Sequence, residues 1–137
     1  MKSTDVPEFP AIARALALLE SEVELDAEAR WCLAERRRPP RIGPLPAALS
    51  DALAVARAAA ASRALERADA ALWAAAERCQ RGWAEHVGWQ RIERELTDAE
   101  RAAACVSGRK GRRLQSAWRD AKRRRSVQAV AVPVDDA

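Results

Sequence analysis

The stretch RALERADAALWAAAERCQRGW (residues 63–83) places an apolar side chain at every third or fourth position. Those side chains are Leu65, Ala68, Leu72, Ala76, Cys79 and Trp83. This spacing predicts the buried face of an α-helix. We predict that the helix begins near Ala47 and ends between Gly82 and Gly88. About 35 helical residues span roughly 50 Å, so we expect the helix to kink near Ser62 or to project into a partner.

Two shorter helices are predicted before this long helix. The first occupies residues 11–25, with Pro10 in its first turn, where a missing N–H costs nothing. Its expected core face consists of Ile12, Leu16, Leu19 and Val23. The second occupies residues 27–38, with Asp26 as its N-cap. The segment RRRPPRIGPLP (36–46) ends it, because its prolines and glycine cannot continue a helix.

Two further segments follow the long helix. HVGWQRIEREL (86–96) is predicted to be a helix, with a short strand as the alternative. TDAE (97–100) has the spacing of a capping box, in which Thr and Glu satisfy each other's backbone amides. The helix that it starts is expected to run to about Val106, with Ser107 and Gly108 as its C-cap.

These elements predict an all-α fold, a small bundle of about five helices with one long alanine-rich helix. One helical domain is expected over residues 9–125, between a flexible N-terminus (1–8) and an extended tail (126–137), which is either an edge strand or an unattached arm. The chain has 33 alanines but only 25 Leu, Ile, Val and Phe residues, so little apolar area is available to the core. We therefore expect a homodimer or another protein partner, bound through residues 11–25 and 47–86, to complete it.

The basic charge is concentrated near the C-terminus, in GRKGRRLQSAWRDAKRRR (108–125). Residues 109–125 hold nine basic side chains and one acidic one, whereas the other 120 residues hold 15 basic and 19 acidic ones. A basic helix is predicted over 112–125, and its expected inner stripe consists of Leu114, Ala117, Trp118 and Ala121. Such asymmetry favours a polyanion or an acidic protein as partner. A solvated helix end, rich in arginine through base composition, is the alternative.

The segment 97–125, a helix, a tight basic turn and a second helix, resembles the helix-turn-helix of DNA-binding proteins. Ala104, Gly108, Leu114 and Ala117 fit the register of that pattern. Ser107 and Arg109 flank the glycine where the pattern has apolar residues, so the resemblance is partial. It implies a second helix that lies in the major groove.

A second resemblance starts from the glycines of GRKG (108–111). VSGRKGRRLQSA is similar to the phosphate-clamping GXXG loop of KH domains and the helix that follows it. The segment SVQAVAV (126–132) would then supply the next strand. A KH-like fold also needs a strand before the first helix, and VGWQRIEREL (87–96) is a poor one.

The leading hypothesis is a non-enzymatic nucleic-acid-binding protein, with DNA favoured over RNA. The residues expected to contact phosphates or bases are Arg109, Lys110, Arg112, Arg113, Gln115, Arg119, Lys122 and Arg123. Among these, Arg112, Gln115 and Arg119 are the candidates for base contacts. The alternative function is a helical assembly subunit or adaptor, whose long alanine-rich helix binds partner proteins.

Other features of the sequence are weaker signals. Arg36, Arg37, Arg38 and Arg41 form a secondary basic patch, which either contacts phosphates or complements a helix C-terminus. Most of the five tryptophans are expected in the core, although Trp83 and Trp89 are alternatives for base stacking.

No catalytic, metal or cofactor site is expected. His86 is the single histidine, no His/Cys pair has ligand spacing, and no glycine-rich phosphate loop or nucleophile elbow occurs. The isolated Cys32, Cys79 and Cys105 and the absence of a signal peptide favour a reducing, bacterial-type cytoplasm or association with the nucleoid. No apolar run approaches the ~20 residues of a membrane span.

Overall fold

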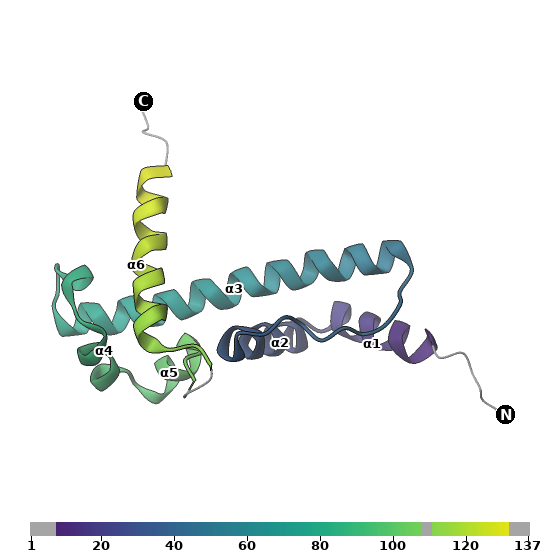
Figure 1. Cartoon of the computed structure of the whole chain (residues 1–137), viewed down its shortest axis with the longest axis horizontal. Coiled ribbons are helices and arrows are strands. Elements are labelled where there is room, and N and C mark those ends of the chain that lie inside the picture. The colour runs from purple at the N-terminus through teal and green to yellow at the C-terminus, as the bar shows by residue number, and fades with distance from the viewer. Residues whose placement is uncertain (1–7, 108–110, 132–137) are drawn as a thin grey trace. The chain divides into compact units, whose positions relative to one another are not determined.

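The structure is a computed structural model that describes residues 8–107 and 111–131 (Figure 1). Within these ranges the elements are α1 (Glu8–Glu20), α2 (Glu22–Glu35), α3 (Ala47–Cys79), the 3-10 helix η1 (Ala84–His86), α4 (Trp89–Glu95), α5 (Asp98–Ala104) and α6 (Leu114–Ala131). No strand occurs among the described residues. The predicted all-α class is confirmed, including the long alanine-rich helix.

Contacts divide the chain into two compact units, Met1–Leu65 (unit 1) and Glu66–Ala137 (unit 2). The first part of α3 belongs to unit 1, and its second part belongs to unit 2. Each unit has its own cluster of buried side chains. The single helical domain expected over 9–125 therefore stays a prediction.

Unit 1 begins with two helices whose boundary differs from the predicted one. The backbone of Ser21 is extended, and its Oγ accepts a hydrogen bond from the Glu24 amide at 3.2 Å. A serine in this role satisfies an amide that the first turn of a helix leaves unpaired. α2 therefore begins at Glu22, and the prediction of Asp26 as an N-cap is wrong. Asp26 lies within α2 and accepts a hydrogen bond from Arg63 at 3.0 Å.

The buried face of α1 also differs from the expected one. Ala11, Ala15 and Leu18 are buried, whereas Leu16 is 45% exposed and Val23, in α2, is 79% exposed. α1 packs through its small residues, and the break at position 21 ends the periodicity that would have joined Val23 to this face. The predicted stripe is wrong for Leu16 and Val23, and its other two members are half-buried.

The proline-rich segment ends α2 as predicted, although the helix stops at Glu35 and not at the expected residue 38. α2 ends at Glu35, and Arg36 takes a left-handed conformation with φ 57° while its amide bonds to the Cys32 carbonyl. Residues 37–46 contain no regular element, and α3 begins at Ala47 as predicted. Arg57 of α3 donates to both carboxylate oxygens of Glu28 in α2, at 2.7 and 2.8 Å.

α3 is assigned as one α-helix without a break at Ser62. Ala68, Leu72 and Ala76 are buried as its spacing predicted. The helix ends at Cys79, earlier than expected, because the chain turns at Gly82, whose φ of 82° is a conformation that favours glycine. Trp83, the last residue of the predicted stripe, lies beyond the helix and is 60% exposed.

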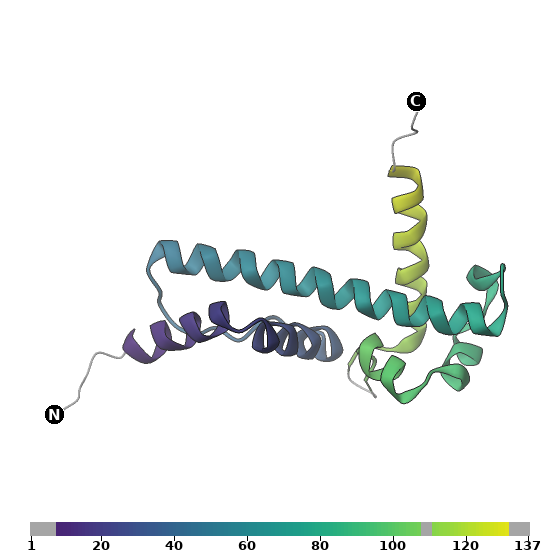
Figure 2. The same cartoon turned by 180° about the vertical axis from the view of Figure 1, so that it is seen from behind.

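Unit 2 packs α4, α5 and α6 with the second part of α3 around one core cluster. Its α4 contacts α6. Both views show α6 crossing the second part of α3 steeply, with its last turns extending beyond the other helices of the unit (Figures 1 and 2). The segment 86–96 is helical rather than a strand, and 126–131 belongs to α6. The KH-like arrangement is therefore wrong, because both segments that it needs as strands are helical.

The boundaries of α5 and α6 correct three expectations. Thr97 and Glu100 form the predicted capping box, but α5 ends at Ala104, and the C-cap is Cys105 with φ 54° rather than Ser107 and Gly108. Burial of Cys105 holds this left-handed turn against the core. α6 begins at Leu114 and reaches Ala131, because no proline or glycine interrupts 114–131. The extended tail is therefore wrong over 126–131, and 132–137 lie outside the described residues.

Candidate nucleic-acid interface

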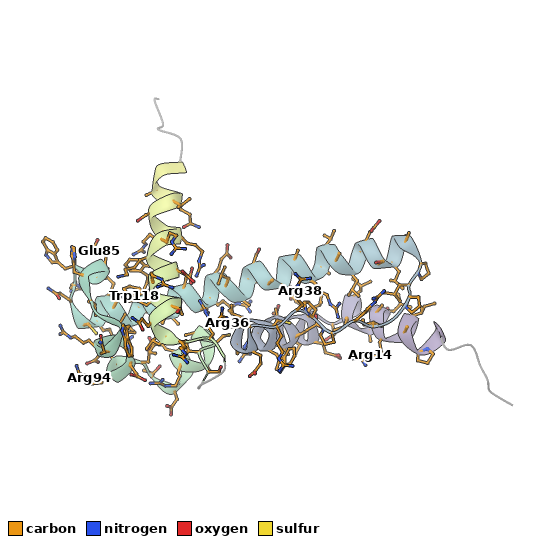
Figure 3. The ribbon with its side chains drawn as sticks, in the orientation of Figure 1. Arg14, Arg36, Arg38, Glu85, Arg94 and Trp118 are labelled. Atoms are coloured by element: carbon orange, nitrogen blue, oxygen red, sulfur yellow. The ribbon has the colours of Figure 1, made fainter. Side chains whose placement is uncertain are left out.

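The inner side of α6 is docked on unit 2 as predicted. Leu114, Ala117, Trp118 and Ala121 are all buried. Trp118, labelled in Figure 3, donates its Nε1–H to the Val87 carbonyl at 2.7 Å, and its indole meets that of Trp73 edge to face with centroids 4.8 Å apart. Edge-to-face packing and a satisfied N–H make a buried indole a strong anchor. α6 is thus held in one orientation.

The outer side of α6 carries polar and basic residues at four-residue steps. Gln115, Arg119 and Arg123 are exposed and lie on one stripe of the helix. Arg123 is 66% exposed and pairs with Asp120 at 3.5 Å. Such a surface pair contributes little to stability and is screened by salt. The stripe can therefore present guanidinium groups to an external anion.

Two more cations of α6 lie against tryptophan rings. The Nζ of Lys122 is 5.3 Å from the centroid of Trp118, and the guanidinium carbon of Arg125 is 3.8 Å from that of Trp73. These cation–π contacts restrict the long side chains without neutralising their charge. Arg125 was not among the predicted site residues. Around the helix axis Arg125 lies beside the inner stripe, so the sequence did not indicate that it would be exposed.

Arg112, which was predicted to lie at the interface, is buried in the core. Its side chain is buried, and Nη1 donates to the Ala104 carbonyl at 2.8 Å. Arg112 precedes α6 and therefore does not lie on the outer stripe. The guanidinium closes the C-terminal end of α5, and the predicted role of Arg112 in contacting phosphates or bases stays a prediction that its burial does not favour.

Asp69, in the second part of α3, is the acidic partner of this buried arginine. Arg112 Nη2 lies 3.9 Å from Asp69, and Arg124 donates to both carboxylate oxygens at 2.7 and 2.9 Å. Burial lowers the pKa of Arg112, and the charge of Asp69 opposes that change. The hydrogen bond to Asp69 raises the pKa of Arg124. Local sequence patterns give no signal for Asp69, because 55 positions separate it from Arg124.

The entrance to α6 departs from the helix-turn-helix pattern. α5 and α6 are separated by the nine residues 105–113, whereas that motif joins its helices by about 3–4 residues. Arg113, directly before α6, is exposed. Arg109 and Lys110 lie outside the described residues.

A hollow of about 440 Å³ lies beside the start of α6. Its wall includes Trp89, Arg101, Arg113 and Gln115. Arg101 also donates to the Glu93 carbonyl at 3.0 Å. Because Gln115 belongs to both, the hollow adjoins the outer stripe. Its indole, cationic and amide groups are suited to contact a flat polar ring.

The secondary patch lies in unit 1 and is described by itself. Arg36, Arg37, Arg38 and Arg41 are all exposed, two of them labelled in Figure 3. Prolines at positions 39 and 40 separate the first three arginines from the fourth. The patch therefore presents its charges from an irregular segment.

Neither a metal-ligating cluster nor a membrane-spanning helix occurs among the described residues. His86 is exposed and stacks in a tilted geometry near Trp83, with centroids 5.2 Å apart. Among residues 8–107 and 111–131, no group of three or more His, Cys, Asp and Glu side chains is arranged to hold a metal ion. In the part of the chain that the structure describes, each helix is too short or too polar to cross a membrane.

Comparison of the chain with known protein families, with characterised proteins and with solved structures found no match.

Proposed function

We propose that unit 2 binds nucleic acid without catalysing a reaction, through the outer side of α6. One observation carries the proposal: Trp118 anchors the inner side of the helix, so Gln115, Arg119 and Arg123 are held on the opposite side. A free basic tail would lack this fixed orientation. Arg113 and Lys122 extend the cationic surface along the same helix.

Duplex DNA is the form of nucleic acid that we favour. The major groove of B-DNA admits an α-helix and exposes a distinct pattern of donors and acceptors for each base pair. The corresponding groove of an RNA duplex is too narrow for side chains to read. Arginines on the stripe would contact phosphates, while Gln115 and Arg119 are the candidates for base edges.

The test is a titration of a labelled DNA duplex, read by fluorescence anisotropy between about 50 and 200 mM salt. The logarithm of the affinity falls as the logarithm of the salt concentration rises, and each phosphate contact steepens this slope by about 0.9. We expect the pair R119Q and R123Q, combined in one variant, to lower that slope by about 2. A duplex RNA of the same sequence should bind more weakly.

A matched control is available in the same unit. Arg81 and Arg94 are exposed and lie away from α6 in the sequence, so R81Q combined with R94Q removes the same charge. We expect this control to keep most of the slope. A wild-type slope near zero, or equal losses in the two double variants, contradicts the proposal.

The adaptor hypothesis is a second candidate, and an observation in unit 1 favours it. Leu16, Val23 and Val55 are exposed by 45, 79 and 70%, on helices where a partner was expected. Apolar side chains mark a protein interface where they form a contiguous patch, and these three lie on α1, α2 and the first part of α3 in the same unit. Light scattering after size exclusion separates the candidates: a monomer that ignores DNA until a protein partner is added favours the adaptor, whereas a DNA complex without a partner favours the first proposal.

A further inference from the structure

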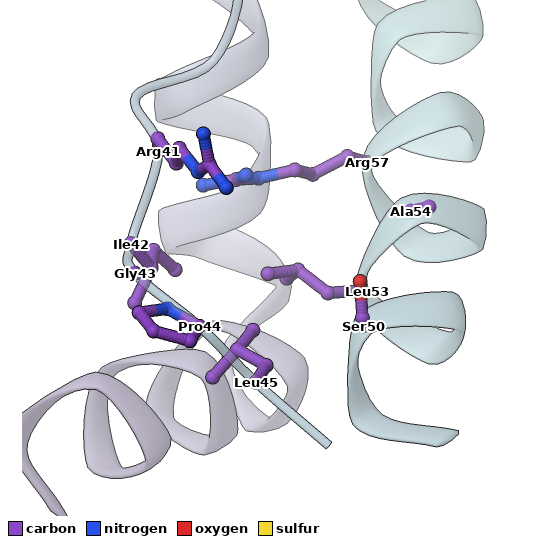
Figure 4. Close-up of a pocket in the computed structure, with 9 residues that line it drawn as sticks. All are labelled: Arg41, Ile42, Gly43, Pro44, Leu45, Ser50, Leu53, Ala54 and Arg57. Atoms are coloured by element: carbon purple, nitrogen blue, oxygen red, sulfur yellow. The ribbon is translucent and has the colours of Figure 1, made fainter. Parts of the chain in front are cut away.

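A pocket of about 380 Å³ lies in unit 1, between the proline-rich segment and the first part of α3 (Figure 4). Ligand pockets in proteins measure roughly 300–1,000 Å³, so this one suits a small molecule. Its lining comes from residues 41–45 on one side and from residues 50–57 of α3 on the other. It is independent of the outer side of α6 and of the nucleic-acid proposal.

One end of the pocket is cationic. Arg41 and Arg57 point toward one another across it (Figure 4). Arg57 uses Nε and Nη2 to bind Glu28, and Nη2 also donates to the Pro40 carbonyl at 3.2 Å. Within the described residues, no hydrogen bond or ion pair engages Arg41 or the Nη1 of Arg57. Glu28 thus pairs with Arg57 alone, which leaves the positive charge of Arg41 uncompensated among the described residues.

The other end of the pocket is apolar. Leu53 points from α3 toward the opposite wall, where Ile42 and Leu45 lie (Figure 4). Leu53 is buried, and both residues of the opposite wall pack against the same core cluster. A ligand that reached this end would remove its own apolar surface from water, at roughly 25 cal/mol per Å².

The pocket is preformed by the backbone around it. Gly43 has φ 129°, a conformation that side chains rarely adopt, and a Cβ there would lie 3.5 Å from the Cβ of Ala11. Proline fixes φ at positions 40 and 44. The pair with Glu28 holds Arg57 in place. A ligand therefore would not have to order the walls that bind it.

We propose that this pocket binds a small amphipathic carboxylate, with one negative charge and a short alkyl or aryl body. The carboxylate would accept hydrogen bonds from Arg41 and from the Nη1 of Arg57. The body would lie against Leu53, Ile42 and Leu45. One uncompensated charge and one apolar end match a monoanion of this class better than a phosphate polyanion.

The test uses octanoate as the probe, followed on the full chain by ¹H–¹⁵N correlation spectra. Acetate keeps the charge without the body, and 1-octanol keeps the body without the charge. We expect saturable chemical-shift changes at the amides of Gly43, Leu53 and Ala54 with octanoate. The other two probes should bind about tenfold or more weakly, because 1-octanol lacks the charged hydrogen bonds and acetate lacks the apolar area that octanoate buries.

R41M is the informative variant, because it removes the charge and keeps an apolar stem on an exposed residue. We expect it to weaken octanoate binding about tenfold or more. R38M makes the same charge change in the same segment but outside the pocket lining, and it should bind like the wild type. Equal octanoate affinity in R41M and the wild type, equal binding of 1-octanol or acetate, or shifts confined to other residues would each overturn the proposal.

Discussion

Asp69 is the shared acidic partner of two arginines of the basic segment, Arg112 and Arg124. Arg112 is buried beside Asp69, and Arg124 binds the same carboxylate through two hydrogen bonds. Charged groups leave water at a cost of several kcal/mol each, on the order of what a good partner returns. Among the described arginines of this segment, Arg112 and Arg124 are therefore structural and contact Asp69 of α3, whereas Arg119 and Arg123 are exposed to solvent.

This division predicts different outcomes for two substitutions of the same type. R112M should lower the free energy of unfolding by about 2 kcal/mol, because it removes charged hydrogen bonds and leaves the Ala104 carbonyl without its donor. R119M should change it by less than about 0.5 kcal/mol, since Arg119 is exposed. Urea unfolding followed by circular dichroism measures both. Similar stabilities for the two variants would show that Arg112 is not structural.

At the scale of the element, α5 shows how a short helix is held at both ends. The capping box of Thr97 and Glu100 starts it, and Arg78 of α3 also donates to Glu100, with 2.6 Å between Nη2 and Oε1. The hydrogen bond from Arg78, aided by the Thr97 amide, lowers the pKa of Glu100 to about 2. Seven residues are few for a helix to form on its own. α5 thus depends on these contacts and on the core.

The lowered pKa predicts an acid-sensitive contribution to stability. The pKa of Glu100 is about 2 in the folded chain, against an ordinary value of about 4.5. Its contribution is therefore fully present above about pH 4.5 and is lost as the pH falls toward about 2. E100Q keeps the capping geometry but cannot titrate, so its unfolding free energy should fall less over this window.

Urea unfolding at several pH values between these limits measures the effect. E85Q is the control, because Glu85 is exposed in η1 and makes no described hydrogen bond or ion pair. We expect E85Q to follow the wild type. If E100Q lost stability with acid as steeply as the wild type, the ion pair with Arg78 would not be the source.

At the scale of the whole molecule, the two units differ in charge. Residues 1–65 hold nine basic and nine acidic side chains, whereas residues 66–137 hold 15 basic and 11 acidic ones. The net charge of +4 therefore belongs to unit 2. A polyanion is expected to meet that unit first, because the field of a charged surface steers association.

This difference predicts how the secondary patch responds to substitution. R36Q combined with R38Q should change the salt slope of DNA binding by less than the value of about 0.9 that one phosphate contact contributes. R119Q combined with R123Q removes the same charge from α6 and should change the slope more. The same anisotropy titration compares them. A larger effect in unit 1 would place the interface at the proline-rich segment.

Local patterns predicted the parts of this protein that depend on local chemistry. The inner stripe of α6, the capping box at Thr97 and the start of α3 at Ala47 each follow from residues within a few positions of one another. The buried face of α1 and the helix boundary at Ser21 were not predicted correctly. The Ser21 cap breaks the helix, and α1 packs through alanines and Leu18, so the spacing of the large apolar residues was misleading.

The sequence by itself determined that the chain is helical, that its long helix is rich in alanine, and that its basic charge gathers in one amphipathic segment. Only the tertiary structure decided which arginines of that segment face solvent. Arg112 and Arg119 are the same residue type seven positions apart, and only the contact with Asp69 and the Ala104 carbonyl separates them. Hydrogen bonds to distant residues leave no periodic trace in the sequence, whereas the burial of one helix face does.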